Sequence, residues 1–145
     1  MTAVKYPLAL IITFIWIGFI CAISFMEAWL KFRAPGVTLP IGLGIGRLVF
    51  SALNKVEWVF AIAIIANYIL EKDLNTVRTL FVFGIPLMIL LIQTIWLLPA
   101  LDVRAVLQIQ RQTVPFSNLH FYYVGMEVIK VFSLTIFGIK LFSKL

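Results

Sequence analysis

The amino-acid sequence predicts an all-α integral membrane protein: an antiparallel four-helix bundle with a short interfacial helix between helices 3 and 4. The first observation is hydropathy, because 63% of the 145 residues are hydrophobic and the mean hydropathy is +1.09. Soluble domains contain roughly 45–50% apolar residues, and a soluble chain of this length could not bury so much apolar surface. The second observation is that four apolar runs are each long enough to span a bilayer, which takes about 20 residues.

The first two helices are expected at about residues 6–30 and 41–70. The first run is too long for the apolar part of a signal peptide, and no A-x-A cleavage site follows it, so we interpret it as a retained helix. The dipeptide Pro35-Gly36 should separate the two helices. The second helix would be about 45 Å long, so it must tilt, bend or begin in the membrane interface.

Helices 3 and 4 are expected at about residues 77–98 and 119–142. Pro99 should kink or end helix 3, because proline has no backbone donor and clashes with the preceding turn. The amphipathic stretch 101–112 fits either the interfacial helix or a kinked continuation of helix 3. The chain would form a single transmembrane domain, 1–145, in a cytoplasmic-type (inner) membrane, with both termini on one side.

The net charge of +6 and the single cysteine narrow the classes of function. Few residues lie outside the predicted helices to form a basic surface, so nucleic-acid binding is not expected. Lysines and arginines near helix ends should contact the headgroups of membrane lipids instead. Cys21, being alone, can form neither an internal disulfide nor a thiolate metal cluster.

Polar side chains from all four helices are predicted to form a layer in the third of the membrane nearest the loops at 31–40 and 99–118. The depths follow from counting ~1.5 Å per residue along each helix. Ionisable groups inside membrane spans are costly and mark functional sites by default. The layer contains Ser24, Glu27, Asn54, Glu57, Gln93, His120, Tyr123 and Glu127.

The spacing along helix 4 supports this layer. His120, Tyr123, Glu127 and Lys130 share one helix face, and such a stripe should point into the bundle. Glu127 and Lys130 could form an ion pair. Left unpaired, Glu57 or Glu127 would be neutral, because desolvation disfavours the charged form.

Our first functional hypothesis is a polar, carboxylate-lined cavity that binds or transports a small apolar molecule, a lipid or an ion. Its ligand-binding residues would be Glu27, Asn54, Glu57, Gln93, Tyr123 and Glu127. Alternatively, the same groups hydrogen-bond across the helices and only hold the bundle together. The tryptophans at positions 16, 29, 58 and 96 would either form walls of the cavity or belong to aromatic belts.

Three further hypotheses remain open. The protein could be a membrane enzyme acting on a lipid-soluble substrate, with His120 and Glu127 or Glu27 as an acid–base pair, although no known catalytic motif is present. Glu27, Glu57, His120 and Glu127 could bind a metal ion, although the Glu-x-x-His motifs of di-iron sites are missing. The chain could also be an accessory subunit of a larger complex or a homo-oligomer. No motif specifies a cofactor, and Asp102 should form a surface ion pair with Arg104.

Several short motifs are distributed along the chain. They are Trp16-x-Gly18, Phe25 to Phe32 (FMEAWLKF), Gly46 to Phe50 (GRLVF), Trp96-Leu97-x-Pro99-x-Leu101-x-Val103-Arg104 and Phe121-Tyr122. With these motifs the chain resembles the small transmembrane-protein-205-like and CopD-like membrane proteins over most of its length. The resemblance implies four helices and, for some members, the handling of copper or other metals. The chain departs from that pattern in not being rich in Met, His and Cys, and it has no first-helix His of the four-helix protoporphyrinogen oxidase kind.

Overall fold

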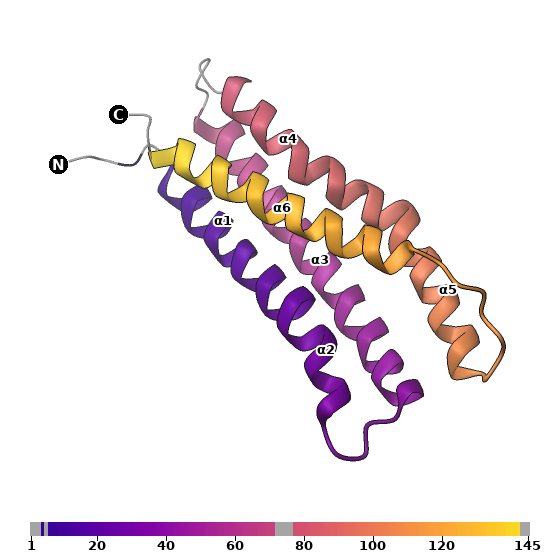
Figure 1. The fold of residues 1–145 in the computed structure, drawn as a ribbon. Coiled ribbons are helices and arrows are strands. Elements are labelled where there is room, and N and C mark those ends of the chain that lie inside the picture. The colour runs from indigo at the N-terminus through magenta and orange to yellow at the C-terminus, as the bar shows by residue number, and fades with distance from the viewer. Residues whose placement is uncertain (1–3, 5, 72–76, 143–145) are drawn as a thin grey trace.

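The computed structural model describes residues 4, 6–71 and 77–142 of the chain. Four antiparallel helical rods form a bundle (Figure 1). The first rod comprises α1 (Pro7–Ile20), the π-helical segment η1 (Cys21–Glu27), α2 (Ala28–Leu30) and the short 3₁₀ turn η2 (Lys31–Arg33). The second is α3 (Leu39–Glu71). The third comprises α4 (Val77–Ile92), the π-helical segment η4 (Gln93–Leu97) and α5 (Leu98–Ile109), and the fourth is α6 (Leu119–Phe142).

Three stretches of helix are long and apolar enough to cross a membrane. They cover Pro7–Arg33, Leu39–Leu70 and Thr79–Ile109. Each exceeds the roughly 20 residues that a span requires. Their length and composition point to an integral membrane protein, in agreement with the predicted fold class.

The four predicted helices are present, and past Pro99 the third takes one of its two expected courses, the continuation of helix 3. It continues through Pro99 to Ile109, so residues 101–109 extend the third rod and do not form a separate interfacial helix. The ring of Pro99 would clash with the carbonyl group four residues earlier. That carbonyl belongs to Ile95, which lies in η4, where the wider π-helical turn relaxes the usual register.

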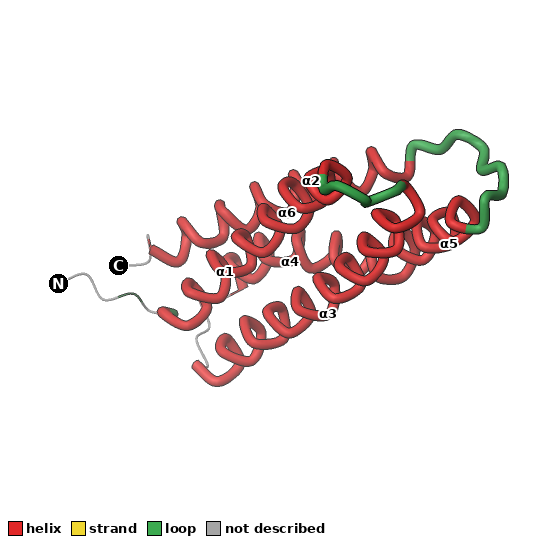
Figure 2. The backbone as a smooth tube through the Cα atoms, turned by 90° about the horizontal axis from the view of Figure 1, so that it is seen from below, coloured by secondary structure: helices red, strands yellow, loops and turns green. Residues whose placement is uncertain are grey.

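The bundle has two distinct ends (Figure 1). The start of α1, the end of α3, the start of α4 and the end of α6 meet at what we call the terminal end. The opposite end, here the loop end, carries residues 34–38 and 110–118. Along the bundle α1 packs on α3 and α6, α4 packs on α6, and α5 packs on α3 (Figures 1 and 2).

An apolar core fills the terminal half of the bundle. The rings of Tyr6 and Tyr68 stack with centroids 4.4 Å apart, and those of Phe83 and Phe137 lie 5.0 Å apart. Such aromatic contacts bury large areas and add to the stability of the bundle. The core comprises Tyr6, Ala9, Trp16, Ile20, Ala61, Ile64, Tyr68, Phe83, Leu90, Leu134, Phe137 and Leu141.

A close contact joins the first and second rods at the loop end. The ring of Phe32 lies directly against Gly42, so that a Cβ atom placed on Gly42 would come within 2.1 Å of Phe32 Cε1. One turn further along α3, the ammonium group of Lys31 lies over Gly46. The glycines of this turn therefore leave room for side chains of η2.

We predict that Gly42→Ala lowers the free energy of unfolding by about 1–3 kcal/mol, because the added methyl group overpacks against Phe32. Gly44→Ala is the matched control, since nothing lies within 4 Å of its Cβ position. Helix propensity alone should make this control about 0.5–1 kcal/mol more stable. Thermal unfolding of both variants in detergent measures the difference, and equal unfolding temperatures would contradict the contact.

Candidate functional site

Two buried carboxylates and one buried ammonium group meet in the middle of the bundle. Lys130 Nζ lies 2.5 Å from Glu57 Oε2 and 2.7 Å from Glu127 Oε1. The exposed fraction is 1% for Glu57 and 0% for Glu127 and Lys130. A third contact of 2.6 Å joins Lys130 Nζ to Gln93 Oε1. The three N–H groups of Lys130 thus match three acceptors from three different rods.

Neutral donors complete the hydrogen bonding of the two carboxylates. Gln93 Nε2 donates to Glu127 Oε1 and Ser24 Oγ to Glu127 Oε2, both at 2.7 Å. Trp16 Nε1 donates to Glu57 Oε2 at 2.8 Å. We call these six residues (Trp16, Ser24, Glu57, Gln93, Glu127 and Lys130) the buried cluster. Because every rod contributes to it, the cluster crosslinks the whole bundle.

Local helix geometry positions these side chains. Glu127 and Lys130 are three residues apart on α6 and share one face, as predicted. Gln93 is the first residue of η4 and Ser24 lies within η1. π-helical segments inside α-helices are rare and occur frequently at functional sites. Both described π segments contribute a polar side chain to the cluster.

A second polar group lies beside the cluster. The hydroxyl oxygen of Thr94 accepts hydrogen bonds from Asn54 Nδ2 at 3.0 Å and Trp58 Nε1 at 2.9 Å, and it donates to the carbonyl oxygen of Leu90 at 2.7 Å. Asn54 precedes Glu57 by three residues on α3, and Thr94 follows Gln93. These residues therefore extend the polar layer from the cluster towards the loop end.

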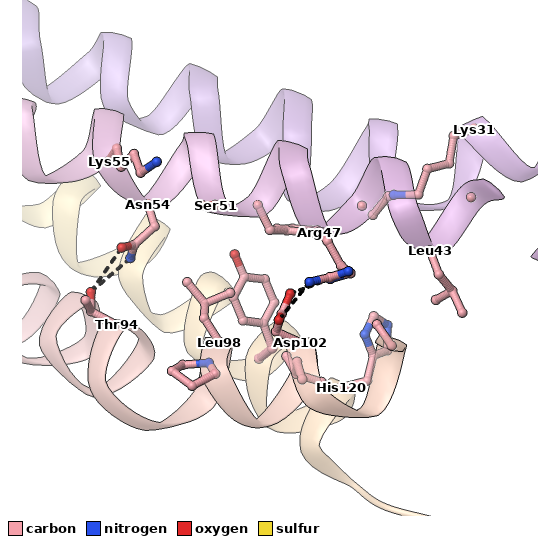
Figure 3. A pocket seen from close by; sticks show the side chains of 18 of the residues that line it. Lys31, Leu43, Arg47, Ser51, Asn54, Lys55, Thr94, Leu98, Asp102 and His120 are labelled. Carbon is pink, nitrogen blue, oxygen red and sulfur yellow. Dashed lines mark hydrogen bonds and ion pairs between the residues drawn. The ribbon is translucent and has the colours of Figure 1, made fainter. Parts of the chain in front are cut away.

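A cavity of about 430 Å³ opens at the loop end, between α3 and the rods that carry α2, α5 and α6 (Figure 3). Apolar side chains, among them Phe32, Leu43, Phe50 and Leu98, form much of its wall. The volume lies within the roughly 300–1,000 Å³ of typical ligand sites. Its polar lining consists of Lys31, Arg47, Ser51, Asn54, Lys55, Thr94, Asp102, His120 and Tyr123.

The charges in this lining are mostly positive. The lining contains three basic side chains, those of Lys31, Arg47 and Lys55, and one acidic side chain, that of Asp102. Lys31 pairs with Glu27 four residues before it, at 3.2 Å. We expected a carboxylate-lined cavity, but Glu57 and Glu127 belong to the buried cluster and do not line this one.

An ion pair bridges the cavity from α3 to α5. Arg47 Nε lies 2.5 Å from Asp102 Oδ1, and Arg47 Nη2 lies 3.0 Å from Asp102 Oδ2 (Figure 3). The expected partner of Asp102 was Arg104, which instead donates to the carbonyl oxygen of Pro115. Both side chains of the Arg47–Asp102 pair are more than one-third exposed, so the pair contributes little to stability.

The structure divides the predicted ligand-binding residues into three groups. Asn54 and Tyr123 line the cavity, Glu57, Gln93 and Glu127 belong to the cluster, and Glu27 pairs with Lys31 at the cavity rim. Tyr123 is 4% exposed and links the first two groups, because its hydroxyl group hydrogen-bonds with Ser24. All four helices therefore contribute to one polar region, as predicted. This region consists of the buried cluster and the polar lining of the cavity.

The four candidate metal ligands do not form one group. Glu57 and Glu127 meet around an ammonium group, while Glu27 and His120 lie elsewhere. Within the described residues, no three His, Cys, Asp or Glu side chains are grouped closely enough to hold a metal ion. Seven positions of α6, or about 10 Å of helix, separate His120 in the cavity from Glu127 in the cluster.

Sequence reasoning missed several residues of the site. Thr94 carries no sequence signal that separates it from other helix threonines. Arg47 and Lys55 did carry one, since both are ionisable residues within a predicted span. Trp16 and Trp58 do not line the cavity, and they donate their indole N–H groups to Glu57 and Thr94.

No family model, curated protein sequence or solved structure matches this chain. The resemblance to transmembrane-protein-205-like and CopD-like proteins therefore stays a prediction.

We predict that Lys130→Met lowers the free energy of unfolding by about 3–5 kcal/mol, because it removes the buried cation that both Glu57 and Glu127 contact. Lys55→Met is the matched control, since Lys55 is exposed, and it should change stability by no more than about 0.5 kcal/mol. Adding Glu57→Gln and Glu127→Gln to Lys130→Met should restore part of the loss. Denaturation in detergent measures all three, and a Lys130→Met variant as stable as Lys55→Met would contradict the ion pairing.

Proposed function

We propose that the chain is an integral membrane protein that binds an acidic lipid in the cavity at the loop end. The proposal is supported by the three long apolar helices, which would place the cavity near one membrane face. We propose binding and not transport, because the cavity occupies one end of the bundle and an apolar core fills the other end.

The excess of cations around the apolar cavity is the observation that carries the proposal. Lys55 is exposed, and no other described residue pairs with it. Arg47 presents a planar guanidinium group that already holds the carboxylate of Asp102 in a bidentate pair. A phosphate group could take the place of that carboxylate, since arginine binds both in the same geometry.

The apolar part of the lining suits the rest of such a ligand. Phe32, Leu43 and Phe50 lie beside the cations, so a molecule with a negative headgroup and an apolar body would meet matching surfaces. Basic pockets at the membrane surface are a known means of binding anionic lipid headgroups. The Asn54–Thr94 pair offers further hydrogen-bonding groups at the inner end of the cavity.

We expect the purified protein to retain phosphatidylglycerol in preference to phosphatidylcholine with the same acyl chains. Arg47→Gln and Lys55→Gln should each weaken retention of phosphatidylglycerol about tenfold or more, since a hydrogen bond to a charged group contributes about 1.5–3 kcal/mol. Native mass spectrometry of the detergent-solubilised protein, with each lipid added in turn, measures the bound fraction.

Lys140→Gln is the matched control, because Lys140 is an exposed lysine near the terminal end of α6. It should leave phosphatidylglycerol retention unchanged. Equal retention of the two lipids, or an equal effect of all three substitutions, would refute acidic-lipid binding in the cavity.

A further inference from the structure

We propose that the buried cluster binds one exchangeable proton, and that Glu57 carries it on Oε1. This site is separate from the proposed lipid site, and its existence does not depend on what the cavity binds. Two carboxyl groups, those of Glu57 and Glu127, share the single ammonium group of Lys130.

No other cation balances this charge within the described residues. From η1 and α1 the cluster is faced by Ser24 and Trp16, and from η4 by Gln93, all of them neutral. The remaining titratable group is Tyr123 on α6, which is neutral as a phenol.

The cations nearer the loop end do not balance the charge of the cluster, because they have other partners or are exposed. Lys31 pairs with Glu27, and Arg47 with Asp102. Lys55 shares α3 with Glu57, but its side chain is exposed. With both acids ionised, the cluster would therefore hold an unbalanced negative charge out of contact with water, which is strongly unfavourable. Binding one proton removes that charge.

The hydrogen bonds of Lys130 indicate that its side chain is an ammonium group, so that the additional proton lies on another residue. The three N–H groups of its ammonium form each have an acceptor: Glu57 Oε2, Glu127 Oε1 and Gln93 Oε1. Neutral Lys130 would have one donor fewer than it has acceptors. The ammonium form of Lys130 fits these three contacts, and we place the additional proton on a carboxylate.

The two carboxylates differ in the number of donors that they face. Glu127 accepts three contacts distributed over both oxygens, from Lys130, Gln93 and Ser24. Glu57 accepts two, from Lys130 and Trp16, both at Oε2. The hydrogen bonds found for Glu57 among the described residues are both at Oε2 and not at Oε1. Donors stabilise the ionised form of a carboxyl group, so we assign the proton to Glu57, the acid with fewer donors, and to its Oε1.

Infrared spectroscopy tests this directly, because a protonated carboxyl group has a C=O stretching band that a carboxylate lacks. We expect one such band at neutral pH from the wild-type protein in a detergent without carbonyl groups. Glu57→Gln should abolish the band. Glu127→Gln should abolish it too, because the remaining pair of Glu57 and Lys130 is then balanced. Glu27→Gln, the control, should leave it unchanged.

A matched pair of donor variants identifies the protonated residue. Trp16→Phe removes a hydrogen bond to Glu57 Oε2 and should shift the band to higher frequency, whereas Ser24→Ala removes one to Glu127 and should not. Absence of the band in the wild type, or its persistence in Glu127→Gln, would overturn the shared proton. A shift with Ser24→Ala in place of Trp16→Phe would overturn its assignment to Glu57.

Discussion

The ammonium group of Lys130 is held between Glu57 on α3 and Glu127 on α6, and the arrangement of the bundle depends on this contact. Burying three ionisable groups is costly unless each finds partners of good geometry. The partners come from the other two rods, as Trp16 and Gln93 show. A rotation or axial shift of any rod would leave a charged or polar group unsatisfied, so the cluster selects one packing among the many that apolar helices could adopt.

The cluster also separates two environments. On its terminal side, tightly packed aromatic and aliphatic residues close the bundle. On its loop side lies a cavity of about 430 Å³ lined by cations and apolar groups. Tyr123 belongs to both sides of this boundary, since it lines the cavity and reaches Ser24. The cluster therefore joins a dry interior to a site that a ligand can enter.

Local patterns explain why much of the architecture was predictable. Helix positions follow from apolar runs and breakers, and α6 begins and ends at the expected residues. The pairing of Glu127 with Lys130 follows from their spacing on one helix. The residue pattern left two courses open for the chain after Pro99, and the π-helical segment η4, in which the helix continues, has no signal in the sequence. The cationic lining was not predicted, because lysines and arginines were assigned to lipid headgroups and only acidic and neutral polar residues were assigned to the layer.

By itself the sequence determined that the chain has four helices, three of them long and apolar enough to cross a membrane, and that polar groups from all four meet at one level, since hydropathy and residue spacing are local properties. Only the tertiary structure decided which acid meets which cation. Lys130 lies 73 positions from Glu57, and Arg47 lies 55 positions from Asp102. Such pairings depend on the rotation and axial offset of neighbouring helices, which are set by packing along the whole bundle. Consequently the same polar residues that suggested one acidic cavity are divided between a buried, proton-binding cluster and a basic cavity beside it.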